Sequence, residues 1–246
     1  MKLLIDIGNT TTSVGLWKNN KLSMITSGKN NKLLSILKKY SKKEIDNIFF
    51  TSVISDKENK RIIGKLKKIY TSSIKQIKAT RVLLGMTNGY AKPKHLGADR
   101  WATIVASFIL YKRPLIIVDC GTAISIDIVN RRGVHLGGYI LGGVAGYSKS
   151  FKNAYHLKNI KIKQDTTAQM KSFPNSTQSG IEEGYLLMVI SAIENTYSEV
   201  KKNQKISPNV LVTGGNGKII SKRLSIKNKY DSDLVLKSIG IISNHQ

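Results

Sequence analysis

Residues 3–16 read LLIDIGNTTTSVGL, and residues 115–129 read LIIVDCGTAISIDIV. Both stretches run through an apolar strand to an aspartate, one further residue and a glycine, and then through small residues into a second apolar strand. This pattern predicts two β-hairpins, each with an Asp-x-Gly turn. The repetition indicates an internal duplication that produces two related lobes. An incidental match is the alternative, because apolar strands that end in glycine turns are common.

The acid and the glycine turn of each hairpin suit a site for phosphate and a divalent cation. A glycine turn brings backbone N–H groups close to an anion, and carboxylate oxygens are ligands that Mg²⁺ prefers. Asp6 would hold Mg²⁺ in the first hairpin, while the turn amides and hydroxyls would bind phosphate. An ordinary β-turn, in which Asp and Asn bond to their own backbone, is the alternative. A second such turn with Asp119, Gly121 and Thr122 favours the functional interpretation.

Length and cysteine content limit the class of protein. At 246 residues the chain accommodates two modest lobes. No apolar run approaches the roughly 18 residues of a membrane helix, so we expect no membrane association. Cys120 is the only cysteine, which excludes an intrachain disulfide and a four-thiolate metal site. We therefore expect a cytoplasmic protein. Cys120 could also be a nucleophile, but no histidine stands in a pattern that would activate it.

The formal net charge of +25 is the most conspicuous feature of the composition. Such a charge can attract nucleic acid, an anionic membrane or an acidic substrate. However, only seven of the 40 basic residues are arginine, and the lysines are spread through many segments. Phosphate contacts usually recruit arginine forks as well as lysine. We therefore expect a solvated, lysine-rich surface and no nucleic-acid partner.

Strand-like and helix-like segments alternate along the chain, which predicts an α/β fold. The pattern favours helices at 32–40 and 57–70, strands at 47–53 and 74–84, a helix after residue 100 that Pro114 closes, and a long helix after Gly180. In VLVTGGNGKII (210–220), a strand opens into paired glycines before a helix. Paired glycines let a flat ligand such as a nucleoside approach the backbone, although strand-to-helix turns also use glycine for steric reasons alone.

The segment YAKPKHLGADRWAT (90–103) supplies the candidate catalytic residue. Asp99 would stand at the start of a helix, exposed by the small Gly97 and Ala98, where it could accept a hydroxyl proton as a general base. The alternative is that Asp99 only caps the helix, a role that aspartate fills readily.

These residues together resemble the type III pantothenate kinases, bacterial enzymes of coenzyme A biosynthesis in the actin/Hsp70/sugar kinase superfamily. The resemblance covers nearly the whole chain and rests on motifs in the family's order: DIGNTTTS, YAKPKHLGADR, VDCGTA, GGYILGG, NSTQSGIEEGY, VTGG and DLVLKSIGII. It implies an α/β fold of two related, ribonuclease H-like lobes with the active site in the cleft. The lobes would span 1–113 and 114–246, and the C-terminal helix could pack back on the first lobe.

The resemblance also implies the chemistry, which is phosphoryl transfer from ATP to pantothenate with Mg²⁺ and a monovalent cation, K⁺ or NH₄⁺. Asp99 would be the base, Asp119 would hold the monovalent cation, and Arg100 suits the pantothenate carboxylate because its planar fork pairs with both oxygens. The implied ATP contacts are Asp6, Ile7, Gly8, Asn9, Thr10, Thr11, Thr12, Ser13 and Thr122. The implied pantothenate contacts are Tyr90, Gly97, Ala98, Asp99, Arg100 and, from the neighbouring subunit of a homodimer, Thr177.

The sequence departs from the family pattern in three places, and two rival functions are considered after them. Leu141 replaces a usual proline, residues 154–160 lack a usual Leu-Pro pair, and Asn216 replaces an acid.

One rival function is a kinase of the same superfamily that acts on a sugar or another small hydroxy acid. The other is a nucleic-acid-binding or regulatory protein on this scaffold, which the net charge of +25 suggests.

Overall fold

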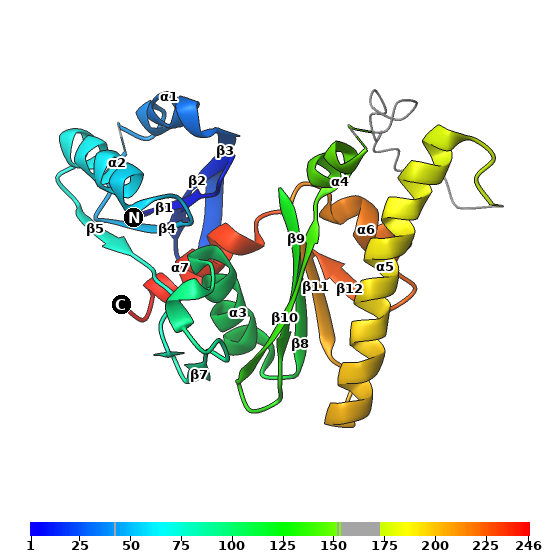
Figure 1. Ribbon diagram of the computed structural model, residues 1–246. Helices are drawn as coiled ribbons and strands as arrows, with labels where there is room; N and C mark the ends of the chain where they lie inside the picture. Colours follow the sequence, from blue (N-terminus) through cyan, green and yellow to red (C-terminus); the bar gives the residue numbers. More distant parts are fainter. Residues whose placement is uncertain (42, 152, 154–172) are drawn as a thin grey trace. The chain divides into compact units, whose positions relative to one another are not determined.

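The computed structural model describes residues 1–41, 43–151, 153 and 173–246, and these form two compact α/β units (Figure 1). The first unit consists of Met1–Leu110 and Asp233–Gln246, and the second consists of Tyr111–Ser232. The last residues join the first unit because helix α7 (Leu234–Ser243) packs against its sheet.

The first unit is built on a five-stranded sheet with the order β3-β2-β1-β4-β5. Its strands are β1 (Lys2–Ile7), β2 (Thr11–Lys18), β3 (Lys21–Lys29), β4 (Asn47–Ser52) and β5 (Ser73–Gln76). The first three strands form an antiparallel meander, whereas β4 pairs in parallel with β1 and β5 in parallel with β4. The quoted stretch 3–16 thus forms the predicted hairpin of β1 and β2.

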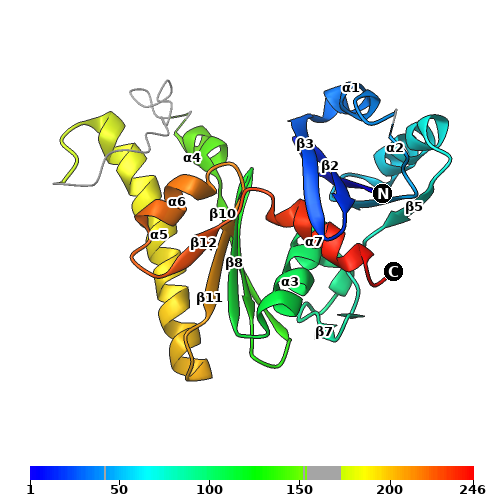
Figure 2. The same cartoon turned by 180° about the vertical axis from the view of Figure 1, so that it is seen from behind.

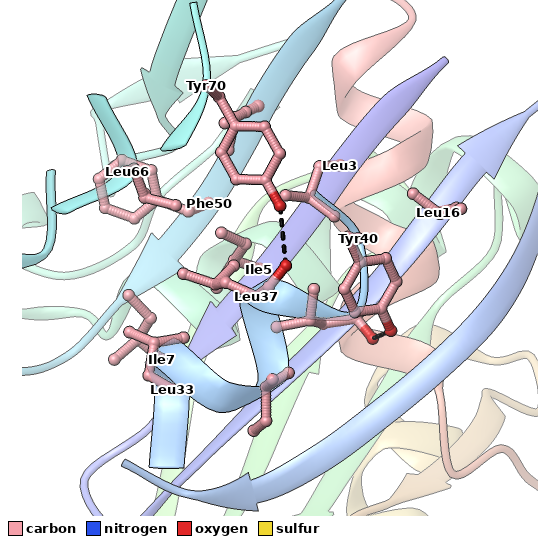
Figure 3. Close-up of a cluster of buried hydrophobic side chains, with 13 residues drawn as sticks. Leu3, Ile5, Ile7, Leu16, Leu33, Leu37, Tyr40, Phe50, Leu66 and Tyr70 are labelled. Carbon is pink, nitrogen blue, oxygen red and sulfur yellow. Dashed lines mark hydrogen bonds between the residues drawn. The ribbon is translucent and has the colours of Figure 1, made fainter. Parts of the chain in front are cut away.

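One face of this sheet is covered by helices. In chain order these are the 3-10 turn η1 (Asn30–Lys32), α1 (Leu33–Lys38) and α2 (Asp56–Ile69). Alternate β1 residues Leu3, Ile5 and Ile7 point toward these helices, because successive side chains of a strand face opposite sides (Figure 3). The Tyr70 hydroxyl donates to the Leu37 carbonyl (3.0 Å) inside this core and ties the end of α2 to α1 (Figure 3).

The opposite face receives α7, which contacts β1, β2 and β4. Gly240 on α7 lies against the Trp17 indole, and a Cβ there would stand 2.4 Å from a ring carbon. The Lys2 ammonium donates to the Ser243 carbonyl (2.7 Å) at the end of this helix. Glycine therefore permits the close approach of helix and strand, and Lys2 bonds to a carbonyl that the helix leaves unpaired.

After β5, the chain forms short elements and then one long helix. They are β6 (Val82–Leu83), β7 (Met86–Thr87), the 3-10 turn η2 (Pro93–His95) and α3 (Ala98–Tyr111). The single strand expected at 74–84 is therefore wrong. β6 pairs with β7 because Leu84 and Gly85 both adopt positive φ (49° and 81°), the conformation of a two-residue hairpin turn.

The second unit repeats the sheet of the first, with the order β10-β9-β8-β11-β12. Its strands are β8 (Leu115–Cys120), β9 (Ala123–Val129), β10 (His135–Gly142), β11 (Asn209–Thr213) and β12 (Asn228–Tyr230). Its helices are α4 (Val144–Ser150), α5 (Thr177–Gln204) and α6 (Gly217–Arg223). They cover one face of the sheet, which Figures 1 and 2 show from opposite sides.

The two sheets have the same topology, since an antiparallel meander is followed in each by two parallel strands. This agreement extends over five strands per unit, which favours duplication over the incidental match of two turns.

The long helix begins at Thr177, earlier than expected, because Ser176 and Ser179 form a capping box. The departure at 154–160 lies outside the described residues. No helix in the described ranges is long and apolar enough to cross a membrane.

Candidate active site

The first hairpin turns between Ile7 and Thr11, and its shape comes from its own backbone and from β4. The Gly8 N–H donates to the Thr11 carbonyl (2.9 Å) and closes the turn. Asp6, partly exposed at the end of β1, accepts a hydrogen bond from the Thr51 hydroxyl on Oδ1 (2.8 Å). The parallel register places Thr51 beside Asp6, so the neighbouring strand orients this carboxylate.

Asn30 is a support of this hairpin that the sequence pattern did not indicate. Its side-chain amide donates to the Gly8 carbonyl (2.8 Å) and the Asn9 carbonyl (3.3 Å), and its Oδ1 accepts from the Thr12 hydroxyl (2.8 Å). Asn30 follows β3 and therefore reaches the turn from the adjacent strand. Its only sequence signal is its place after that strand, in a chain where asparagine is abundant.

The candidate phosphate-binding residues of this hairpin differ in exposure. Asn9, Thr10 and Thr11 are exposed at the turn. Ile7 and Thr12 are buried (1% and 0% exposed), so they can offer a ligand only backbone groups. Ser13 is half-buried and shares a hydrogen bond with the Ser27 hydroxyl (2.8 Å). The exposed turn is thus the part of the hairpin that can meet an anion.

The second hairpin has the same plan with a turn one residue shorter. Asp119 lies opposite Ser125, and the Gly121 N–H donates to the Ala123 carbonyl (3.1 Å). Thr122 is exposed at the tip. Two other glycine segments meet this turn. A Cβ on Gly143 would stand 2.4 Å from the Thr122 carbonyl oxygen, and one on Gly214 would stand 2.7 Å from Asp119 Oδ1.

Cys120 does not fit the role of a nucleophile. Its side chain is fully buried (0% exposed) in the core of the second unit. Burial, and to a lesser degree the charge of Asp119, raises the pKa of the Cys120 thiol far above its usual range. Since the thiolate is the reactive form, this cysteine belongs to the packing of the hairpin.

Asp99 stands in the first turn of α3, and Gly97 makes room for its carboxylate. The Gly97 carbonyl accepts the Trp101 N–H (2.9 Å), so Gly97 holds the N-cap position and Asp99 lies two residues further along. Asp99 Oδ1 accepts the Arg100 N–H (2.7 Å). A Cβ on Gly97 would stand 2.6 Å from this oxygen, so only glycine leaves the carboxylate in place. Asp99 is therefore not the N-cap residue.

The start of α3 also lies next to the first hairpin. The same Cβ on Gly97 would stand 3.5 Å from Val53 Cγ1, and the Val53 N–H donates to the Ile7 carbonyl (3.1 Å) at the end of β1. Within the first unit, Gly97 of the GADR segment is thus linked through Val53 to the end of β1, the strand that leads into the first turn.

Tyr90 and Arg100, both expected to contact the substrate, lie against one another. The Arg100 guanidinium donates from Nη2 to the Tyr90 hydroxyl (3.3 Å), and its Cζ lies 5.8 Å from the centre of the ring. Both side chains are partly exposed. Thr177 belongs to the second unit, where it is exposed at the first position of α5, after the N-cap Ser176.

The described residues contain no group of three or more His, Cys, Asp or Glu side chains that could hold a metal ion by themselves. Mg²⁺ in kinases is usually held by one or two carboxylates together with the phosphates of the nucleotide. Asp6, partly exposed beside the turn, offers a carboxylate of this kind.

Two sheets of identical order, each with an Asp-x-Gly hairpin at its centre, define an α/β fold of the actin/Hsp70/sugar kinase type, built of two related units. Within this class, the chain belongs to the type III pantothenate kinase family, whose sequence model matches residues 2–199. Membership of a kinase family implies the use of ATP and a divalent metal ion.

Individual relatives agree with this assignment. The chain is similar to the type III pantothenate kinase of Sulfurihydrogenibium sp. (strain YO3AOP1), at 32% identity over 100% of both chains. It is 33% identical to the type III pantothenate kinase of Persephonella marina, over 100% of this chain and 99% of the relative. Its fold is similar to that of a Campylobacter jejuni protein assigned to the Baf family of transcriptional activators, at 21% identity and a TM-score of 0.63, with 99% and 98% of the chains covered. That last likeness concerns the fold alone.

Proposed function

We propose that this protein transfers the γ-phosphoryl group of ATP to the terminal hydroxyl of pantothenate and forms 4'-phosphopantothenate, the first step of coenzyme A biosynthesis. The family match over residues 2–199 is the observation that carries this proposal. The contact of Gly97, two residues before Asp99, with Val53, which bonds to the end of β1, supports it, because a base for the acceptor hydroxyl must act close to the phosphate groups.

In this proposal Asp99 orients the acceptor hydroxyl and takes its proton. Gly97 supports this role, since its missing side chain leaves space for the Asp99 carboxylate. A general base must lie within hydrogen-bond reach of the proton that it accepts. Asp99 is partly exposed in the first turn of α3, so a substrate can approach its carboxylate.

The two hairpins would bind ATP. Turn amides and the exposed hydroxyls of Thr10, Thr11 and Thr122 suit phosphate oxygens, and the remaining contacts in residues 6–13 would come from the backbone and from Ser13. Asp6 would be a ligand of Mg²⁺, which supplies charge neutralisation at the transferred phosphoryl group. Asp119 would hold a monovalent cation, K⁺ or NH₄⁺.

Pantothenate would lie against the segment from Tyr90 to Arg100. The guanidinium of Arg100 can pair with both oxygens of the pantothenate carboxylate, and Gly97 and Ala98 let the substrate approach the helix start. Thr177 of a second copy would complete the pocket in a homodimer. The exposed first turn of α5 supports this arrangement, as do Leu187 and Met188 (57% and 39% exposed) further along the same helix.

The test is an ADP-release assay with purified protein, Mg²⁺ and K⁺, run with pantothenate, without it, and with a panel of sugars and other small hydroxy acids. We expect ADP to appear only with pantothenate. If ADP release requires a different hydroxy compound, that compound and not pantothenate is the substrate. If ADP release is the same with and without every acceptor, the kinase assignment is wrong.

Asp99→Asn tests the assignment of the base. Asparagine nearly preserves the shape of the side chain but cannot accept the proton, so we expect kcat to fall about 10²–10⁴-fold with KM for ATP retained. Asp56→Asn is a matched control, because Asp56 stands exposed in the first turn of another helix, α2. Near wild-type kcat in Asp99→Asn, with an unchanged Tm, would remove Asp99 as the base.

A further inference from the structure

Arg81 has no place in the site assigned above, yet its contacts converge on the loop that carries Tyr90. It directly precedes β6, and Asn88 directly follows β7. The Asn88 N–H donates to the Arg81 carbonyl (2.9 Å), which adds one hydrogen-bonded pair to the β6–β7 hairpin. Residues 88–91 then leave the hairpin toward η2.

The Arg81 side chain folds over this loop and bonds to three of its carbonyl groups. Nη1 donates to the carbonyls of Asn88 (2.7 Å) and Tyr90 (3.0 Å), and Nη2 donates to the carbonyl of Ala91 (2.9 Å). A planar guanidinium presents its N–H groups in a fixed fork, so these three bonds require one particular shape of the loop. A lysine ammonium is a point charge that could not reproduce this pattern.

Asn88 holds the same loop from the inside. It is fully buried (0% exposed), its Oδ1 accepts the Tyr90 N–H (3.0 Å), and its Nδ2 donates to the Pro93 carbonyl (3.3 Å). The backbone N–H and C=O of Tyr90 are therefore both fixed, the first by Asn88 and the second by Arg81. This arrangement leaves the Tyr90 ring directed at the Arg100 guanidinium.

We propose that Arg81 is a positioning residue that holds the 88–91 loop, and with it Tyr90, in the conformation that binds pantothenate. The proposal rests on the function proposed above. When a binding-competent loop is populated for only a fraction of the time, the apparent affinity for the ligand falls by that fraction. Loss of Arg81 therefore raises KM for pantothenate, whereas kcat stays the same because bound substrate selects the ordered loop.

The test compares Arg81→Ala and Arg81→Lys with Arg61→Ala, a control at an exposed arginine of α2. In Arg81→Ala we expect KM for pantothenate to rise about tenfold, a factor that corresponds to about 1.4 kcal/mol. KM for ATP, kcat and Tm should stay close to the wild-type values. Arg81→Lys should restore only part of the affinity, since it keeps the charge and loses the fork. Arg61→Ala should match the wild type.

Amide hydrogen exchange without substrate gives a readout that does not depend on activity. We expect faster exchange of the Tyr90 amide and its loop neighbours in Arg81→Ala, with unchanged exchange in the β1–β2 hairpin. An unchanged KM for pantothenate together with unchanged loop exchange would overturn the proposal. So would a parallel loss of kcat, ATP affinity and Tm, which indicates a general structural role. If the wild type fails to phosphorylate pantothenate, the proposed function falls, while the exchange data still test the effect of Arg81 on the loop.

Discussion

The hairpin of β1 and β2 and the hairpin of β8 and β9 occupy the same place in two sheets of the same order. At the base of each turn an aspartate faces a serine, Asp6 opposite Ser13 and Asp119 opposite Ser125. On the other side of each aspartate, the parallel strand places a threonine in register, Thr51 in the first unit and Thr213 in the second. The correspondence therefore reaches individual positions.

Side-chain hydrogen bonds are seen at the first turn, and close packing of glycines is seen at the second. Side-chain hydrogen bonds support the first turn, because Thr51 donates to Asp6 and Asn30 bonds to the turn carbonyls and to Thr12. Close backbone packing supports the second turn, where Gly143 and Gly214 approach it to distances that no side chain permits. The duplicated topology has thus kept the aspartates in place, and two glycines pack closely around the second turn.

This difference predicts different tolerances to substitution. A hydrogen-bonded support can lose one bond and relax, which costs about 0.5–1.5 kcal/mol per bond. A support made by close backbone contact cannot relax in this way, because any added atom meets main-chain atoms that the sheet holds fixed. We therefore expect the second hairpin to be the more sensitive of the two.

Gly214→Ala should have the largest effect. Gly214 adopts a φ of +86°, and a Cβ would stand 2.6 Å from the Cys120 carbonyl carbon and 2.7 Å from Asp119 Oδ1. The left-handed conformation costs about 1–2 kcal/mol and the overpacking about 1–3 kcal/mol. We expect a loss of about 3 kcal/mol in the free energy of unfolding, measured by urea denaturation.

The neighbouring Gly215 provides a matched control. It has no atom within 4 Å of the site of a Cβ, so Gly215→Ala should stay within about 0.5 kcal/mol of the wild type. Equal stabilities of the two alanine variants would show that close packing does not hold the second turn.

Asn30→Ala should have a smaller and more local effect. It removes the bonds to the Gly8 and Asn9 carbonyls and the acceptor of the Thr12 hydroxyl. We expect a loss of about 1–2 kcal/mol in stability and a several-fold rise in KM for ATP, because the exposed turn is the part proposed to meet phosphate. Asn31→Ala, at the exposed neighbouring position, should leave both quantities unchanged. A rise in KM for pantothenate alone would contradict this assignment.

These supports also mark the limit of what the sequence predicts. The hairpins, most helices and the place of Asp99 at the start of a helix could be predicted, because apolar alternation, glycine turns and helix-start residues are local signals. Asn30 and Arg81 could not, because both bond mainly to backbone carbonyls, and a carbonyl acceptor leaves no trace in residue identity. The strand expected at 74–84 failed for a related reason. Its apolar pattern runs on past β5 through residues 77–81, which belong to no strand, into β6, which pairs with β7 across the Leu84–Gly85 turn.

The smallest expected effect concerns the residue inside each Asp-x-Gly motif, which is Ile7 in the first hairpin and Cys120 in the second. Both are buried, but only the thiol can titrate. Burial, with a smaller contribution from Asp119, raises the pKa of Cys120 in the folded protein above its unfolded value. Above the unfolded pKa, the unfolded chain releases this proton while the folded protein retains it, so stability falls as the pH rises.

Between pH 7 and pH 9 the wild type should lose about 0.5–1 kcal/mol more of its free energy of unfolding than Cys120→Ala does, measured by urea denaturation at each pH. Parallel pH profiles of the two proteins would mean that the thiol titrates equally in both states, and would contradict its burial in the second hairpin.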